Sequence, residues 1–144
     1  MLKKFITTVW FPLSISVLLV GLMIFLTDVP ERDTLGRYAP MAEALLQGDW
    51  LLGFHPRIPL LFPVLGCLFT FFTAGNGFLG CQIASGLAFV LTVFPLWGIF
   101  RKVFDSRIAL CGTILFALCS YWLRFASGGG RDSTKMFFFI TAIY

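Results

Sequence analysis

Long charge-free runs alternate with short polar stretches along the chain. Residues 5–26 and 78–100 contain no charged side chain. As helices these runs would extend about 33 Å and about 35 Å, which exceeds a hydrocarbon thickness of about 30 Å. The run at 108–124 is shorter and ends at an arginine whose head group can reach the membrane surface. The pattern therefore predicts three membrane spans, at 5–26, 78–100 and 108–124, and the start of a fourth at 136–144.

Polar loops connect these predicted spans, and the first of them has internal structure. We expect outer loops at 27–57 and 125–135 and an inner loop at 101–107. Within the first loop, apolar residues recur at helical spacing up to Gly48, which predicts a short amphipathic helix that stops there. Pro40 lies inside this pattern, so the helix either begins near Pro40 or is kinked at that residue.

Residues 58–74 decide the expected topology. The segment is apolar but contains Pro59 and Pro63, and its apolar core of about 22 Å is short for a crossing, which favours a juxtamembrane or re-entrant helix. If it does not cross, the segments around Asp33 and Asp132 lie on the same outer side. If it crosses, they lie on opposite sides. Counting basic residues does not separate the alternatives, so the length argument favours the first.

Composition supports an integral membrane protein. The 144 residues are 58% hydrophobic and 12% charged, with a mean hydropathy of +0.90, whereas soluble domains carry about 25% charged residues. This excludes a soluble globular domain, a disordered chain and a secreted disulfide scaffold. The net charge of +4 comes from scattered residues, so we expect no nucleic-acid partner. Lys3 and Lys4 precede the first run and favour an N-terminus inside. The expected fold class is an all-α polytopic membrane protein.

The first polar loop is the place to look for chemistry, because it holds five of the seven acidic residues. Asp33 is a candidate general base, and Arg32, Arg37 and Arg57 offer guanidinium groups suited to a phosphate. The alternative is that Asp33 is a solvated loop carboxylate or a helix cap. Asp132 has the same two interpretations, as a functional group or as the cap of the next helix. The four cysteines form no C-x-x-C pair and His55 is the single histidine, so a zinc site has little support.

Several short motifs occur in an order that resembles a known family. Glu31-Arg32-Asp33 is followed by a stretch that ends in Leu46-Gln47-Gly48-Asp49-Trp50 and then by Arg57-Ile58-Pro59-Leu60. Later pieces at 96–104 and 124–133 continue the likeness. This series is similar to GT-C glycosyltransferases, specifically to the dolichyl-phosphate-mannose–protein mannosyltransferase family and its bacterial relatives. The likeness covers residues 31–144.

The resemblance implies the N-terminal part of a GT-C-like transmembrane module with juxtamembrane helices in its first outer loop. It implies transfer of a sugar, with inversion, from a polyprenyl-phosphate carrier to a lipid, glycan or protein acceptor. The reaction would occur on the outer face of a bacterial-type inner membrane, among membrane lipids. Asp33 would be the general base, Arg57 and Arg37 would bind the donor phosphate, and Asp132 would position the acceptor or help to hold a divalent metal ion.

Two further expectations complete the analysis. We expect the 144 residues to be part of a longer chain and to be inactive alone. The alternative function is that of a non-catalytic polytopic membrane protein, such as a transporter or an assembly subunit. Transporters place ionisable groups within their spans, whereas the predicted spans here carry charges only at their ends.

Overall fold

The regular structure of the chain is helical. The computed structural model describes residues 9–26 and 30–144, and these ranges contain helices and no strand. This confirms the all-α class expected from the sequence. The start of the expected first span and Asp28 lie outside the described residues. In chain order the helices are α2 (Trp10–Leu26), the π-helix η1 (Thr34–Tyr38), α3 (Ala39–Leu46), α4 (Trp50–Gly53), α5 (Leu61–Phe72), α6 (Gly77–Val103), α7 (Ser106–Ala117), α8 (Ser120–Ser127) and α9 (Arg131–Ile143).

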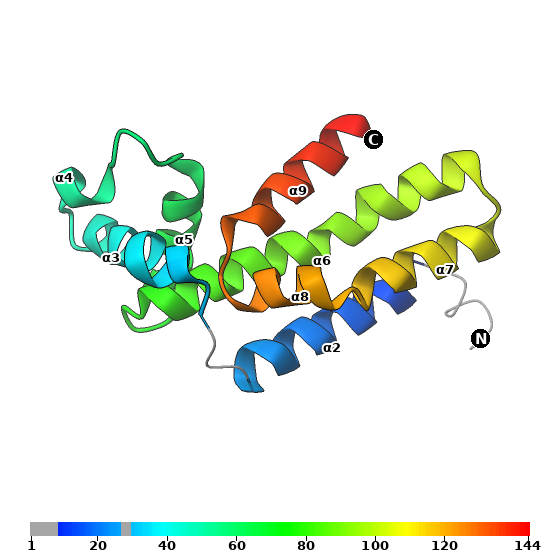
Figure 1. Ribbon diagram of the computed structural model, residues 1–144, viewed down its shortest axis with the longest axis horizontal. Helices are drawn as coiled ribbons and strands as arrows, with labels where there is room; N and C mark the ends of the chain where they lie inside the picture. The colour runs from blue at the N-terminus through cyan, green and yellow to red at the C-terminus, as the bar shows by residue number, and fades with distance from the viewer. Residues whose placement is uncertain (1–8, 27–29) are drawn as a thin grey trace.

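The helices are arranged around α6, which contacts α2, α5, α7, α8 and α9. Figure 1 shows α2 and α7 running along the molecule in the direction opposite to α6. The short elements η1, α3, α4 and α5 gather at the end where α6 begins, and the α6–α7 turn forms the other end. The short helices of the first loop therefore lie at one end of the molecule and the α6–α7 turn at the other, with the longer helices between them.

Helix α6 covers the predicted run at 78–100. The Asn76 side chain caps its start by accepting a 2.9 Å hydrogen bond from the Leu79 N–H, and Arg101 and Lys102 lie in its last turn. Within the described residues it is the one unbroken helix long and apolar enough to cross a membrane, and α7 with α8 gives a second candidate only if the bent pair is counted as one span. At about 1.5 Å per residue, α6 is about 40 Å long.

The expected single span at 108–124 is instead two helices, α7 and α8, which meet at 51°. The chain becomes extended at Cys119, with φ −66° and ψ 104°. Two polar side chains of α6 hold the chain after this bend in place, because they bind the carbonyl groups of Ser127, the last residue of α8, and Gly130, which precedes α9. The Gln82 amide donates to the Ser127 carbonyl at 2.7 Å, and the Ser85 hydroxyl donates to the Gly130 carbonyl at 2.7 Å. These bonds join residues far apart in sequence, which is why a hydropathy pattern does not reveal the bend.

The first loop contains more helix than the amphipathic pattern predicted, and Pro40 explains its form. The Ala39 N–H donates to the Thr34 carbonyl, five residues back, so the turn before Pro40 is wider than an α-turn. A proline ring inside a regular α-helix would clash with the carbonyl four residues earlier, at Gly36. The π segment removes this conflict and lets α3 follow without a break, with Pro40 in its first turn.

Small and hydroxyl-bearing residues fill the interior, and large apolar residues cover much of the outside. Buried hydroxyls of Ser16, Thr92 and Thr113 bond to carbonyls of their own helices, as is common where helices pack in lipid. A Cβ on Gly86 would come within 2.6 Å of Val20, so α2 and α6 approach closely there. The exposed apolar side chains on α2, α5 and α9 include Val17, Leu18, Leu22, Phe25, Leu68, Phe71, Phe72, Phe138, Phe139 and Ile143.

Candidate functional site

The chain on either side of Asp33 is bound to the glycine loop that connects α8 and α9. The Glu31 N–H donates to the Gly128 carbonyl at 3.1 Å, and the Thr34 hydroxyl donates to the Gly129 carbonyl at 2.9 Å. A Cβ on Gly130 would collide with the Glu31 carboxylate, so a side chain at this position would force the Glu31 side chain to move. Gly129 also has φ +77°, which is strained for other residues. The two predicted acidic segments therefore lie at the same end, as expected if residues 58–74 do not cross.

Glu31 lies between the two predicted site carboxylates. Burial is the main cause that raises the pKa of Glu31 above its usual value of 4.5, and the negative charges of Asp132 and Asp33 raise it further. Arg131 and a hydrogen bond from Thr34 oppose this effect. The buried Oε2 atom of Glu31 has no hydrogen-bond partner among the described residues. Glu31 therefore belongs to the site. The sequence pattern did not indicate a role for it, although it lies only two positions before Asp33.

Asp33 presents a partly solvent-accessible carboxylate. It directly precedes η1 but makes no capping hydrogen bond, so the interpretation of Asp33 as a helix cap finds no support. Its Oδ1 atom lies 3.7 Å from a guanidinium nitrogen of Arg37, and the side chains of Arg37 and Asp33 are 60% and 44% exposed. Exposed ion pairs contribute little stability. Asp33 therefore remains available to a bound molecule.

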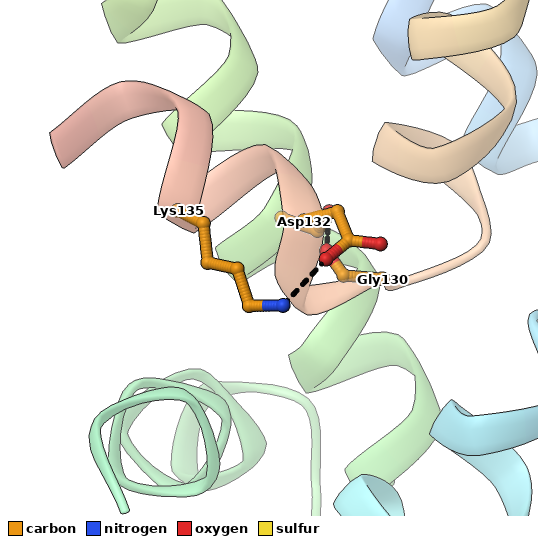
Figure 2. Close-up of polar contacts among 4 residues, drawn as sticks. Gly130, Asp132 and Lys135 are labelled. Atoms are coloured by element: carbon orange, nitrogen blue, oxygen red, sulfur yellow. Dashed lines mark hydrogen bonds and ion pairs between the residues drawn. The ribbon is translucent and has the colours of Figure 1, made fainter. Parts of the chain in front are cut away.

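Asp132 lies in the first turn of α9, with Gly130 in the capping position. The alternative interpretation of Asp132 as the helix cap is therefore wrong, because α9 already begins at Arg131 and the side chain pairs within the helix. The Lys135 ammonium lies 2.8 Å from Asp132 Oδ1, and Figure 2 shows the two side chains turned toward each other. An acidic side chain in the first turn also interacts favourably with the helix dipole.

The three neighbouring carboxylates do not have the arrangement of a metal site. No group of three or more His, Cys, Asp or Glu side chains within residues 9–26 and 30–144 is positioned to hold a metal ion. The structure therefore adds no support to the metal-binding alternative for Asp132.

The two arginines expected to bind phosphate, Arg57 and Arg37, do not line the cavity that contains Glu31. Arg57 is exposed in the loop before α5, and its N–H donates to His55 Nδ1 at 3.3 Å. Arg37, besides its pairing with Asp33, helps to line a hollow of about 210 Å³ together with His55. No contact in the described part of the chain joins Arg57 to Asp33.

Two other arginines lie beside Glu31. A cavity of about 360 Å³ is lined by Pro30, Glu31, Arg32, Tyr121, Arg124 and Phe125. Arg32 comes from the turn before η1 and Arg124 from the last turn of α8. Sequence reasoning did not find Arg124 as a site residue, because only the docking of the two loops brings α8 next to Glu31.

An apolar groove of about 630 Å³ adjoins this cavity between α8 and α9. Tyr121 and Phe125 line both spaces. The groove continues over the apolar side chains of Phe116, Trp122, Met136, Phe139 and Ile140, with Asp132 and Lys135 also in its wall. A cavity lined by charged side chains therefore adjoins a mainly apolar groove.

Comparison of the chain with protein-family models, with curated proteins and with solved structures found no significant match.

Proposed function

We propose that the protein is a membrane glycosyltransferase that transfers a sugar from a polyprenyl-phosphate carrier to an acceptor hydroxyl, with Asp33 as the general base. The observation that carries this proposal is the docking of the 31–34 segment onto the glycine loop. It places an accessible carboxylate at the same end as a cavity with two arginines and an apolar groove. A lipid-linked phosphate sugar has the matching chemistry: an anionic group between an apolar chain and a reactive sugar.

A membrane location is supported by the surface of the helices. Large apolar side chains are exposed along α2, α5 and α9, and apolar surface of this extent marks contact with lipid or protein. With α6 as one crossing, we infer that α2 and the bent α7–α8 pair also cross, giving a multi-pass protein. Arg101, Lys102 and Arg107 lie at the α6–α7 turn, and we propose that this end faces the cytoplasm, although the opposite end also carries basic residues such as Arg32, Arg124 and Arg131. The carboxylates then face the outer side of a bacterial-type inner membrane, and the N-terminus is inside.

The proposed reaction needs one base and one cation. The Asp33 carboxylate accepts the proton of the acceptor hydroxyl, and the hydroxyl oxygen forms a bond to the anomeric carbon. The bond from that carbon to the phosphate oxygen breaks, and the lipid phosphate leaves with the bonding electron pair. A guanidinium group stabilises the charge that develops on the phosphate. Attack from the side opposite the phosphate inverts the anomeric centre.

Asp33→Asn in the full-length natural protein tests this proposal. Permeabilised native membranes supply the acceptor, and the assay follows release of free polyprenyl phosphate from polyprenyl-phosphate hexoses and pentoses. The rate should fall by about 10²–10⁴-fold, the usual contribution of a general base. Asp49→Asn is the matched control. Asp49 is a true cap whose Oδ1 accepts from the Leu51 and Leu52 N–H groups, and asparagine caps about equally well. Near-normal release by Asp33→Asn would contradict the assignment.

A transporter role remains the competing proposal, and the placement of charge argues against it. The described helices α2 and α6 contain no acidic residue, whereas Glu31, Asp33 and Asp132 gather at one end. Transporters bind their substrates near the bilayer midplane.

A further inference from the structure

Two arginines in the cavity beside Glu31 have no partner for their positive charge. The ion pairs between described residues involve Arg37 and Lys135. Neither Arg32 nor Arg124 forms an ion pair with a carboxylate in that part of the chain, although both line a cavity of about 360 Å³ together with Glu31, whose pKa is raised mainly by burial. Two unpaired guanidinium groups in one cavity favour an anionic ligand, and their planar donor geometry suits phosphate oxygens.

The adjoining groove restricts which anion fits. Tyr121 and Phe125 form a wall shared by the arginine cavity and the groove between α8 and α9. Beyond this wall the groove surface is mainly apolar, with Trp122, Phe139 and Ile140 among its residues. A ligand that fills both spaces carries an anionic head and a long apolar chain.

We infer that Arg32 and Arg124 bind the phosphate of a lipid phosphate, and that its hydrocarbon chain lies in the groove between α8 and α9. This inference rests on the proposed function, and it assigns the donor phosphate to different cations from the Arg37 and Arg57 suggested by the sequence. Lys135 also lines the groove, but its charge is paired with Asp132, so the two arginines are the cations assigned to the phosphate.

The test is equilibrium binding of farnesyl phosphate, a short isoprenoid monophosphate, to the full-length protein in phosphatidylcholine nanodiscs. Arg32→Ala and Arg124→Ala should each weaken binding by roughly tenfold or more, since each removes charged hydrogen bonds. Arg37→Ala and Arg57→Ala are the matched controls. Each also removes one arginine from an exposed position, and we expect affinity to change by less than about twofold. All four side chains are exposed, so we expect unchanged thermal unfolding.

Separate ligands test the head and the chain. Farnesol, which lacks the phosphate, and inorganic phosphate, which lacks the chain, should each bind much more weakly than farnesyl phosphate. Phe139→Ala, in the groove, should weaken binding of farnesyl phosphate and leave that of inorganic phosphate unchanged. If inorganic phosphate binds as tightly as farnesyl phosphate, the assignment of the groove is overturned.

The remaining outcomes separate this inference from the proposed function. If Arg37→Ala or Arg57→Ala weakens binding while Arg32→Ala and Arg124→Ala do not, the inference is overturned and the glycosyltransferase proposal stands. If the wild-type protein binds no farnesyl phosphate, both fail. Asp33→Asn should bind farnesyl phosphate normally even where transfer is lost, because Asp33 acts on the acceptor.

Discussion

Local environment gives individual carboxylates of this protein opposite properties. Glu31 is partly buried next to two other acidic residues, and burial is the main cause of its raised pKa. Asp105 is fully exposed at the start of α7, where a hydrogen bond from the Ile108 N–H is the main cause of its lowered pKa. Asp105 is therefore stabilised in its charged form and Glu31 in its neutral form. Glu31 is therefore a titratable group where the 31–34 segment contacts the glycine loop, whereas Asp105 caps the start of α7.

Glu31→Gln should make the protein less sensitive to pH. Below the ordinary pKa of 4.5, Glu31 is protonated in both the folded and the unfolded chain. As pH rises, the unfolded chain ionises first, so the wild type loses stability until the raised pKa of the folded state is passed. The glutamine variant lacks this loss, and at neutral pH its unfolding midpoint should be higher by a few degrees at most.

Thermal unfolding in detergent between about pH 2 and about pH 8 measures this dependence. Asp105→Asn is a control of opposite sign. Its lowered pKa contributes stability that is present at neutral pH and lost as pH falls, so this variant should be less stable than the wild type at neutral pH and match it in acid. A Glu31→Gln variant whose midpoint follows the wild type at every pH would contradict the proposed environment of Glu31.

At the scale of elements, a few long-range hydrogen bonds determine the shape of the site. Thr34 connects η1 to the glycine loop, while Gln82 and Ser85 connect the same part of the chain to α6. The carbonyl groups concerned belong to residues 127–130, which are buried. Buried carbonyl groups that lose their donors cost free energy, so these three side chains should stabilise the loop strongly for their size.

Thr34→Val should destabilise the protein by about 1–3 kcal/mol, because it leaves the buried Gly129 carbonyl without its donor. Valine keeps the size and branching of the side chain. The transfer rate should fall as well, since the docked loop positions Asp33. Thr141→Val is the matched control. The Thr141 hydroxyl bonds only to the Phe137 carbonyl of its own helix, so we expect a change within about 0.5 kcal/mol. Equal effects of the two substitutions in thermal unfolding would show that the Thr34 bond does not hold the loop.

The elements also show what the sequence could and could not predict. The charge-free run at 78–100 specifies α6 almost by itself, because an uninterrupted apolar stretch of this length has few alternatives to a helix. Pro40 predicted a helix start or a kink in the first loop, but local sterics alone did not predict a π segment there. The bend at Cys119 and the place of Arg124 in the site depend on contacts with α6 and Glu31. Pairings between such distant residues leave no periodic signal, so they could not be predicted.

At the scale of the whole molecule, charge is distributed between the two ends. Glu31, Asp33 and Asp132 lie at the end with η1 and the start of α9, while Arg101 and Arg107 lie at the α6–α7 turn. The helices between these ends expose mainly apolar side chains. The end with the three carboxylates also carries Arg32, Arg37, Arg124, Arg131 and Lys135, so basic residues occur at both ends and the proposed outer position of the carboxylates is tested directly.

Labelling of single cysteines in intact cells tests this orientation. The background protein has its four cysteines, at positions 67, 81, 111 and 119, replaced by alanine. Arg37→Cys and Lys135→Cys lie in the two docked segments, and Ser106→Cys lies at the α6–α7 turn. A membrane-impermeant maleimide should react with the first two from outside and with Ser106→Cys only after the cells are permeabilised. If Arg37→Cys and Lys135→Cys react from opposite sides, the docking of the loops is wrong. If all three react from the same side, α6 does not cross, and the proposed multi-pass topology is wrong.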